Sequence, residues 1–453
     1  MKLSKLSMGV AALCAVATAP AFALTAATYN PANAMRIYVS GATAMDVGLE
    51  NASLAMCVAG TAHRYTGSNQ LVLLCTPDGT KITGLAGRTQ LAVHKHSVGG
   101  SGNGVAPVNN STPLPFLDLV KIAAGCANAT NAGTNIACAE TIGTLTTAVA
   151  APLGISDVEP QFFGAEAGTY NNLLIEPLAT VIFGMPVSTV AYAALQAAQG
   201  LTVNATDAAN IPSLSSAQIT SMFTQEGQSW SGLTGAVIPG GPSNDLVYVA
   251  RRADSSGTQK TYEAVIARTS NGNLAGKSCY VGLPAFLSGV AALDNTAANL
   301  ACDGSINLIV NNSGSGQVAA CLNRFNAVGK GAIGTLTTEA VSTTGWKHVR
   351  INGQLPNYAN VKAGSFSAYG DAALNSRVSP SIGADHTAYR TAFKTLFAAV
   401  PVLHPAFGDV ATDAGKGGVI GLNKVTGQTT GNPWNRTNDS SVIDNCRPAR
   451  ADF

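Results

Sequence analysis

Short apolar stretches alternate with polar, glycine-rich turns along most of this chain. Residues 35–40 alternate apolar and polar side chains, which is typical of a strand with one buried face. Residues 91–96 and 153–157 predict two further short strands. The run from Leu178 to Val187 is apolar and β-branched, and it predicts a strand that is buried on both faces.

Helical segments are expected between these strands. Ser215 is a plausible amino-terminal cap for a helix over residues 215–223, and a second helix is expected over residues 259–268. Further on, the expected order is strand 306–310, a helix that ends near Phe325, and strand 332–334. Strands that alternate with helices in this way predict an α/β fold with mixed, mostly parallel sheets.

The first residues have the pattern of a secretory signal. Lys2 and Lys5 precede a short apolar run, and small residues around Ala23 suit a cleavage site. The run is much shorter than the ~20 apolar residues of a membrane span. The sequence therefore predicts a signal peptide over residues 1–23 and a periplasmic or secreted protein.

The charge balance excludes some classes of partner. Without residues 1–23, the chain keeps 24 basic and 24 acidic residues, because that segment holds two of the 26 lysines and arginines and no acid. A neutral chain has no basic field to attract nucleic acid or an anionic membrane.

Eight cysteines remain after the predicted signal. An even number in an exported protein indicates disulfides, although spacing alone does not fix the pairing. Sequence-near pairs, Cys57 with Cys75 and Cys126 with Cys138, are the ones we expect.

Three strand–turn–helix junctions are rich in Gly, Ser and Thr. They lie at residues 40–43, 100–104 and 254–258. The first turn of a helix has unpaired N–H groups and a partial positive charge, and Gly lets the backbone approach an anion closely. Arg252, beside the third junction, adds a permanently charged fork suited to oxyanions. Together these features predict an oxyanion site.

Asp157 follows one of the predicted strands and is unexpected beside an anion. Its carboxylate can accept a hydrogen bond only from a ligand that still carries a proton, as phosphate does near neutral pH and sulfate does not. The residue is therefore either a selectivity element against sulfate or an ordinary helix cap.

These segments resemble the phosphate-binding proteins of bacterial phosphate ABC transporters, which belong to the two-lobed periplasmic substrate-binding superfamily, type II. The resemblance runs in order over most of residues 35–370. Its strongest part is the run Arg251-Arg252-Ala253-Asp254-Ser255-Ser256-Gly257-Thr258. The other matching segments are Ile155-Ser156-Asp157, Ile211 to Trp230, Asn311 to Gly316, Gly331 to Gly334 and Ile351 to Gly353.

The resemblance implies a role for each matching residue. Thr43 would offer a hydroxyl, Ala44 a backbone N–H and Ser101 a second hydroxyl. Asp157 would accept the phosphate proton. Arg252 would pair with the phosphate and be held by Asp254, while Ser256, Gly257 and Thr258 would donate from a helix start.

The resemblance also implies a two-lobed fold with a hinge of two crossovers, near residues 176–181 and 334–337. Residues 24–178 with 337–453 would form one lobe and residues 179–336 the other, closing on the ligand. We expect a monomer that binds inorganic phosphate or a related oxyanion, needs no cofactor and meets an ABC transporter permease. Residues 51–90 and 107–150 are longer than the family needs, and the tail 415–453 has no assigned role.

Two alternatives stay open. The chain could be a secreted or cell-surface structural protein that keeps this fold. A phosphatase-like hydrolase is less favoured, because the sequence holds neither a Gly-x-Ser-x-Gly elbow nor a His-Glu-x-x-His motif. His94 and His96 would share one face of a strand, but with no carboxylate or cysteine near them in the sequence we expect a surface role rather than a metal site.

Overall fold

The structure is a computed structural model in which residues 24–67, 69–126, 135–138, 144–163, 170–266, 290–291, 302–303, 308–338, 340, 342, 344–398, 419–420, 434–435 and 450–451 are described. The predicted signal peptide, Cys279, Cys446 and most of the tail 415–453 lie outside the described residues.

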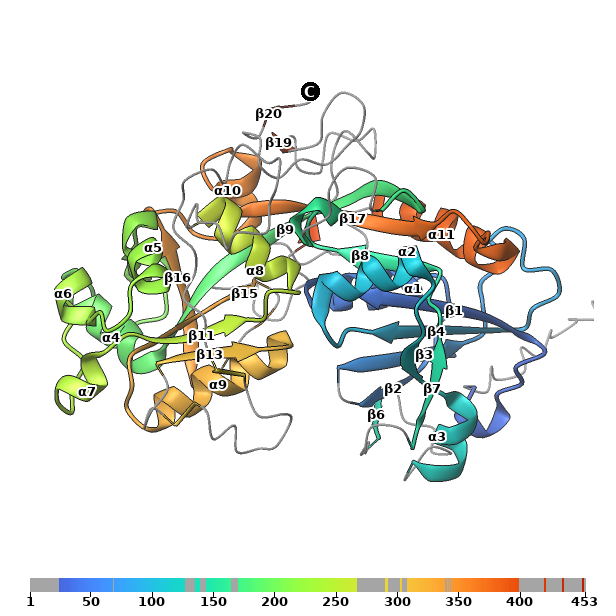
Figure 1. The fold of residues 1–453 in the computed structure, drawn as a ribbon, viewed down its shortest axis with the longest axis horizontal. Coiled ribbons are helices and arrows are strands. Elements are labelled where there is room, and N and C mark those ends of the chain that lie inside the picture. Colours follow the sequence, from blue (N-terminus) through green and yellow to red (C-terminus); the bar gives the residue numbers. More distant parts are fainter. Residues whose placement is uncertain are drawn as a thin grey trace, which may run out of the picture.

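Two α/β lobes lie side by side and are joined through two long strands (Figure 1). The first lobe is built on β1 (Ala34–Gly41), β2 (His63–Gly67), β3 (Gln70–Cys75), β4 (Gln90–His96), β6 (Asn135–Ala137) and β8 (Leu153–Ser156). The second is built on β10 (Ser213–Leu214), β11 (Tyr248–Arg252), β12 (Val290–Ala291), β13 (Ile309–Asn312), β14 (Ala332–Gly334), β15 (Leu336–Thr337) and β16 (Trp346–Ile351). This arrangement confirms the predicted two-lobed α/β fold.

Strands β9 (Leu173–Ser188) and β17 (Tyr369–Arg377) connect the lobes. The first part of β9 pairs antiparallel with β17, and β17 also pairs with β8 of the first lobe. The last part of β9 pairs with β14, β15 and β16 of the second lobe. The sheets are mixed, with parallel neighbours at β1–β4, β1–β8, β11–β13 and β11–β14.

The chain returns to the first lobe later than the sequence suggests. Strand β16 still pairs with β9 and β10 of the second lobe. The return passage therefore follows α10 (Tyr358–Lys362) and enters β17, whereas the sequence placed it near residues 334–337. The family pattern did not reveal that β16 adds a strand to the second lobe.

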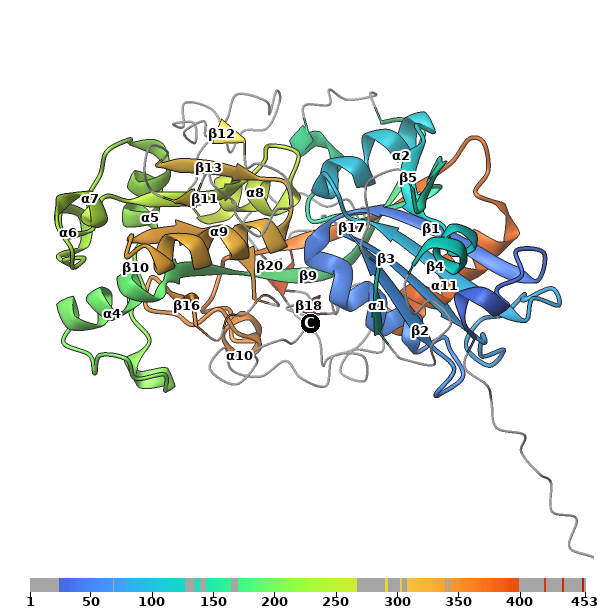
Figure 2. The ribbon, with the colours of Figure 1, turned by 90° about the horizontal axis from the view of Figure 1, so that it is seen from below.

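Helices cover both lobes (Figure 2). The described α-helices are α1 (Asp46–Leu54), α2 (Ala106–Asn110), α3 (Leu119–Gly125), α4 (Thr189–Ala198), α5 (Ser216–Thr224), α6 (Trp230–Thr234), α7 (Pro242–Asp245), α8 (Gly257–Thr261), α9 (Ser315–Ala327), α10 and α11 (Gly383–Ala398). Shorter turns are η1 (Ala26–Thr28), η2 (Thr43–Met45), η3 (Gly100–Gly104), η4 (Pro160–Phe163), η5 (Ala208–Asn210) and the π-helix η6 (Tyr262–Ile266). None of the helices in the described part of the chain is long and apolar enough to cross a bilayer.

Helix α5 begins as predicted. The Ser215 hydroxyl accepts from the Gln218 N–H at 3.2 Å, and the Gln218 side chain accepts from the Ser215 N–H at 2.8 Å. This reciprocal pair satisfies two backbone donors that the first helical turn otherwise leaves unpaired. The buried face of α5, with Ile219, Met222 and Phe223, packs into the main core.

Disulfides fasten the added segments of the first lobe. Cys57 is bonded to Cys75 and Cys126 to Cys138, which confirms both predicted pairs. A third disulfide joins Cys302 to Cys321 on α9. Residues 107–150 add a two-stranded antiparallel sheet of β5 (Leu114–Leu117) and β7 (Thr146–Val149). The remaining short strands are β18 (Val419–Ile420), β19 (Trp434–Asn435) and β20 (Arg450–Ala451).

Candidate functional site

The first of the three glycine-rich turns follows strand β1, and a buried lysine donates hydrogen bonds to its backbone. Gly41 has a φ of 108°, a region that favours glycine, and the chain then enters η2 with Thr43 and Ala44 buried. The Lys95 ammonium, on β4, donates to the carbonyls of Gly41 at 2.8 Å and Ala42 at 3.3 Å. Lys95 therefore fixes the turn that presents Thr43.

The second turn follows β4 and reaches the other lobe. Ser101 in η3 accepts from the Asp157 N–H at 3.1 Å, so it ties η3 to the end of β8. The Gly102 N–H donates at 2.8 Å to the Ser255 carbonyl, which precedes α8. A Cβ added at Gly100 would lie 3.2 Å from Arg252 Nη2, so the lobes approach closely here because that residue is glycine.

The third turn joins β11 to α8 in the second lobe. Ser256 caps α8, since its hydroxyl accepts from the Gln259 N–H at 3.3 Å. The Thr258 hydroxyl donates at 3.0 Å to Asp157 Oδ2. A Cβ added at Gly257 would lie 2.3 Å from the Ser101 hydroxyl and 2.8 Å from Asp157 Cβ, so the helix start lies directly against both.

Arg252, at the end of β11, is fully buried and lies where the three turns meet. Its Nη1 donates to the hydroxyls of Thr43 at 3.1 Å and Ser315 at 3.0 Å, and its Nη2 donates to the Ser313 carbonyl at 2.9 Å. Its Nε has no hydrogen-bond partner among the described residues. Burial lowers the pKa of Arg252 to about 10, so the guanidinium stays charged at neutral pH.

Asp157 is the buried acid beside this cation. Burial raises its pKa to about 6, against the opposing effects of the Thr258 hydroxyl and the positive charges of Arg252 and Lys95. Its Oδ1 accepts no hydrogen bond from any described group. The junction therefore holds one acceptor oxygen and one guanidinium nitrogen that no group in the described part of the chain satisfies.

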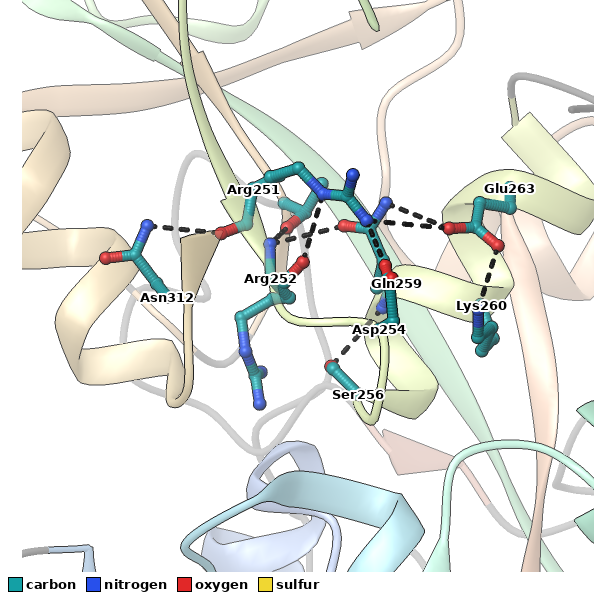
Figure 3. Close-up of polar contacts among 9 residues, drawn as sticks. Arg251, Arg252, Asp254, Ser256, Gln259, Lys260, Glu263 and Asn312 are labelled. Carbon is teal, nitrogen blue, oxygen red and sulfur yellow. Dashed lines mark hydrogen bonds and ion pairs between the residues drawn. The ribbon is translucent and has the colours of Figure 1, made fainter. Parts of the chain in front are cut away.

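Asp254 has a different role from the implied one. Its carboxylate pairs with Arg251, not with Arg252 (Figure 3). Its side chain is 63% exposed. Neighbouring residues of a strand point to opposite faces, so Arg251 and Arg252 diverge. Arg251 turns toward Asp254 and the buried Glu263, whose other carboxylate oxygen is 3.3 Å from Lys260 Nζ.

Three residues at the junction, Lys95, Ser313 and Ser315, were not predicted as site residues from the sequence. Lys95 also lies 3.0 Å from Asp46, so its charge is balanced inside the first lobe. Ser313 and Ser315 lie at the start of α9, and Ser315 Oγ is 3.0 Å from Thr43 Oγ1 of the other lobe. The glycine-rich segment 311–316 signalled a turn, but only the fold places it against Arg252.

The structure thus brings together most of the predicted site residues. Thr43, Ser101, Asp157, Arg252, Ser256, Gly257 and Thr258 all lie where the two lobes meet, and Ala44 is buried next to Thr43. Asp254 points away. One guanidinium, several hydroxyls, two helix starts and one acceptor carboxylate form an arrangement that can hold a small protonated oxyanion.

The predicted surface role of His94 and His96 is wrong, because both side chains are only 2% exposed. Their Nδ1 atoms lie 2.8 Å from the carbonyls of Leu117 and Pro115 in β5, so the added segment covers them. Burial lowers the pKa of each imidazole to about 4, which keeps both neutral at physiological pH.

No protein-family model and no curated protein sequence matches this chain. Several solved structures are similar to it, including the following three. One, a phosphate ABC transporter substrate-binding protein with bound phosphate from Clostridium perfringens, has 13% identity and a TM-score of 0.43, and the similarity covers 82% of this chain and 96% of that chain. An ABC-type phosphate transport receptor from Vibrio cholerae has 13% identity and a TM-score of 0.39, and the similarity covers 83% of this chain and 98% of that chain. PstS from Borrelia burgdorferi has 9% identity and a TM-score of 0.35, and the similarity covers 81% of this chain and 93% of that chain. At these values the role of each residue has to come from the geometry of this site.

Proposed function

We propose that this chain is an exported solute-binding protein that holds inorganic phosphate, or a closely similar oxyanion, between its two lobes. It would deliver the anion to an ABC transporter permease. The signal-like residues 1–23 and the disulfides support export. The proposed mechanism is binding and release, with no bond made or broken.

The observation that carries this proposal is the position of Arg252. The Arg252 guanidinium is fully buried and donates hydrogen bonds to oxygen atoms of both lobes. These belong to Thr43 of the first lobe and to Ser313 and Ser315 of the second. Burying a charge is costly unless it is paired. Asp157 is the carboxylate with the larger electrostatic effect on Arg252, and its Oδ1 has no hydrogen-bond partner among the described residues. An anion that accepts from Arg252 and donates its own proton to Asp157 would satisfy both groups.

The proposed ligand is phosphate because of the acceptor. At pH 7 the Asp157 carboxylate is mostly ionised, since its pKa is about 6. It would repel sulfate, which has no proton to donate, and accept a hydrogen bond from monohydrogen phosphate. Charge-assisted hydrogen bonds contribute ~1.5–3 kcal/mol each, so a few of them could offset the dehydration of the anion.

Isothermal titration calorimetry on phosphate-free protein tests the proposal. We expect saturable phosphate binding and little heat from sulfate at pH 7.5. Arg252→Met should weaken phosphate binding by more than about 100-fold, because it removes at least two charge-assisted hydrogen bonds.

Arg36→Gln is the matched control, since it removes an arginine from an exposed position on β1 and should leave phosphate affinity unchanged. A flat phosphate titration of the folded wild-type protein would refute the proposal. So would an Arg252→Met variant that keeps wild-type affinity.

A further inference from the structure

The first lobe contains a pocket that the proposed phosphate site does not use. It has a volume of about 90 Å³ and lies between the amino-terminal stretch and the added segment 107–150. Its lining includes Tyr29, Arg36 and Tyr38 from the amino-terminal stretch and β1, and Phe116 and Asp118 from the added segment. The pocket and the added segment are two features without a role in phosphate binding, and they coincide.

The floor of this pocket is aromatic. The Tyr38 ring stacks on His94 with ring centres 4.6 Å apart, and it meets Phe116 edge-on at 5.2 Å. His94 is neutral, because its pKa is about 4 and its Nδ1 faces the Leu117 carbonyl. The rings therefore form an uncharged wall with electron-rich faces, which attracts a cation such as an ammonium group.

The pocket also presents one charge of each sign. Arg36 is exposed on β1, and Asp118 is the N-cap of α3. Both residues are described, and they form no ion pair with each other. Asp118 accepts from the Val120 N–H at 2.9 Å and the Thr147 hydroxyl at 2.7 Å, which leaves acceptor capacity on both oxygens. Burial acts to raise the pKa of Asp118, but these hydrogen bonds hold it below its ordinary value, so the carboxylate is charged at neutral pH.

The pocket is distinct from the lobe junction. Tyr38 lies three residues before the end of β1 at Gly41, about 10 Å of extended strand, and Thr43 follows beyond that end in η2. The groups that line the pocket come from the first lobe alone, so occupancy does not require the second lobe.

We propose that this pocket binds a small zwitterion, a free amino acid such as glycine or L-alanine. The ligand carboxylate would pair with Arg36, and its ammonium would lie over Tyr38 and pair with Asp118. Separated opposite charges suit a ligand that carries both, and the small volume suits one with a short side chain.

Calorimetric titration of the full chain with L-alanine and with glycine tests this proposal. We expect saturable binding of both. Acetate and methylammonium, each with one of the two charges, should bind at least about tenfold more weakly, because each loses one ion pair. Arg36→Gln should weaken L-alanine binding by about tenfold or more for the same reason. Arg36 is exposed, so this variant is expected to fold.

Arg252→Met is the matched control, and it should leave L-alanine affinity unchanged even though phosphate binding is lost. The two sites can therefore fail independently of each other. The zwitterion proposal is overturned if neither amino acid binds, if Arg36→Gln binds L-alanine as tightly as wild type, or if acetate or methylammonium binds as tightly as L-alanine.

Discussion

At the scale of single residues, the site depends on two buried ionisable groups of opposite charge, Arg252 and Asp157. Arg252 keeps its charge because oxygens from both lobes surround it. Asp157 keeps its charge at neutral pH against the effect of its own burial, which raises its pKa to about 6. A carboxylate held in such a place destabilises the ligand-free protein, so we infer that it is retained for binding.

Replacing this acid should change ligand choice. In the Asp157→Asn variant an amide that can donate takes the place of a carboxylate that only accepts. We expect phosphate affinity to fall and sulfate affinity to rise by about tenfold or more at pH 7.5, since one repulsion is lost and one donor is gained. Competition between the two anions in a calorimetric titration measures this. Unchanged sulfate binding in a folded variant would contradict the assigned role.

The same substitution has a pH-dependent effect on stability. The folded-state pKa of Asp157 lies above the ordinary value of 3.8, so the folded protein binds a proton that the unfolded chain releases between pH 4 and about 6. This contribution to stability is present below pH 4 and is lost as the pH rises through about 6. Ligand-free Asp157→Asn should therefore melt higher than wild type at pH 7.5, with the difference shrinking toward pH 4.

At the scale of elements, the alternation of apolar strands and capped helices was predictable from local pattern. Strands β1, β4, β8 and β14 and helix α5 all lie within the predicted segments, give or take two residues. Strand β17 and helix α11 were not predicted. Nearly all of β17 is buried although it contains Asp371, Asn375 and Ser376. Its burial follows from pairing with β8 and β9, a tertiary effect that a local pattern does not encode.

The start of α8 gives the element-scale prediction. In Gly257→Ala the added methyl would overlap the Ser101 hydroxyl, which lies 2.3 Å from the ideal Cβ position. We expect the turns of the two lobes to separate and phosphate affinity to drop by about tenfold or more, because hydrogen bonds to the anion need short distances. Calorimetry on the purified variant measures the change.

Gly316→Ala is the matched control for this variant. Gly316 lies in the first turn of α9, and the nearest atom to its ideal Cβ is Asn69 Oδ1 at 3.9 Å, an ordinary contact. That variant should bind phosphate as wild type does. Equal affinities of Gly257→Ala and wild type would show that the close packing at α8 is dispensable.

At the scale of the whole molecule, the site exists only where the lobes meet, and this is the part that local sequence could not supply. The turns at residues 40–43 and 254–258 are more than two hundred positions apart. The repeated strand–turn–helix pattern suggested a shared oxyanion site, and the resemblance to a known family suggested which turns form it. Even so, it did not foresee Lys95 beneath the first turn or Ser315 beside Arg252, because both contacts depend on the packing of this particular chain.

Closure of the lobes is the prediction at this scale. Binding should favour the closed arrangement, because only then do both lobes reach the anion. Small-angle X-ray scattering should therefore give a smaller radius of gyration with phosphate than without it, and no change with sulfate. The Arg252→Met variant should show no contraction. Contraction of that variant to the wild-type extent would mean that closure does not depend on the proposed site.

Strand β9 is one uninterrupted element that contributes its first half to one lobe and its second half to the other. Neither lobe is therefore a detachable module. A cut made between them would leave a half-strand on each fragment with unpaired backbone groups along its edge. Efforts to divide this protein, or to graft one half onto another scaffold, should keep both long strands whole and place new chain ends in surface loops instead.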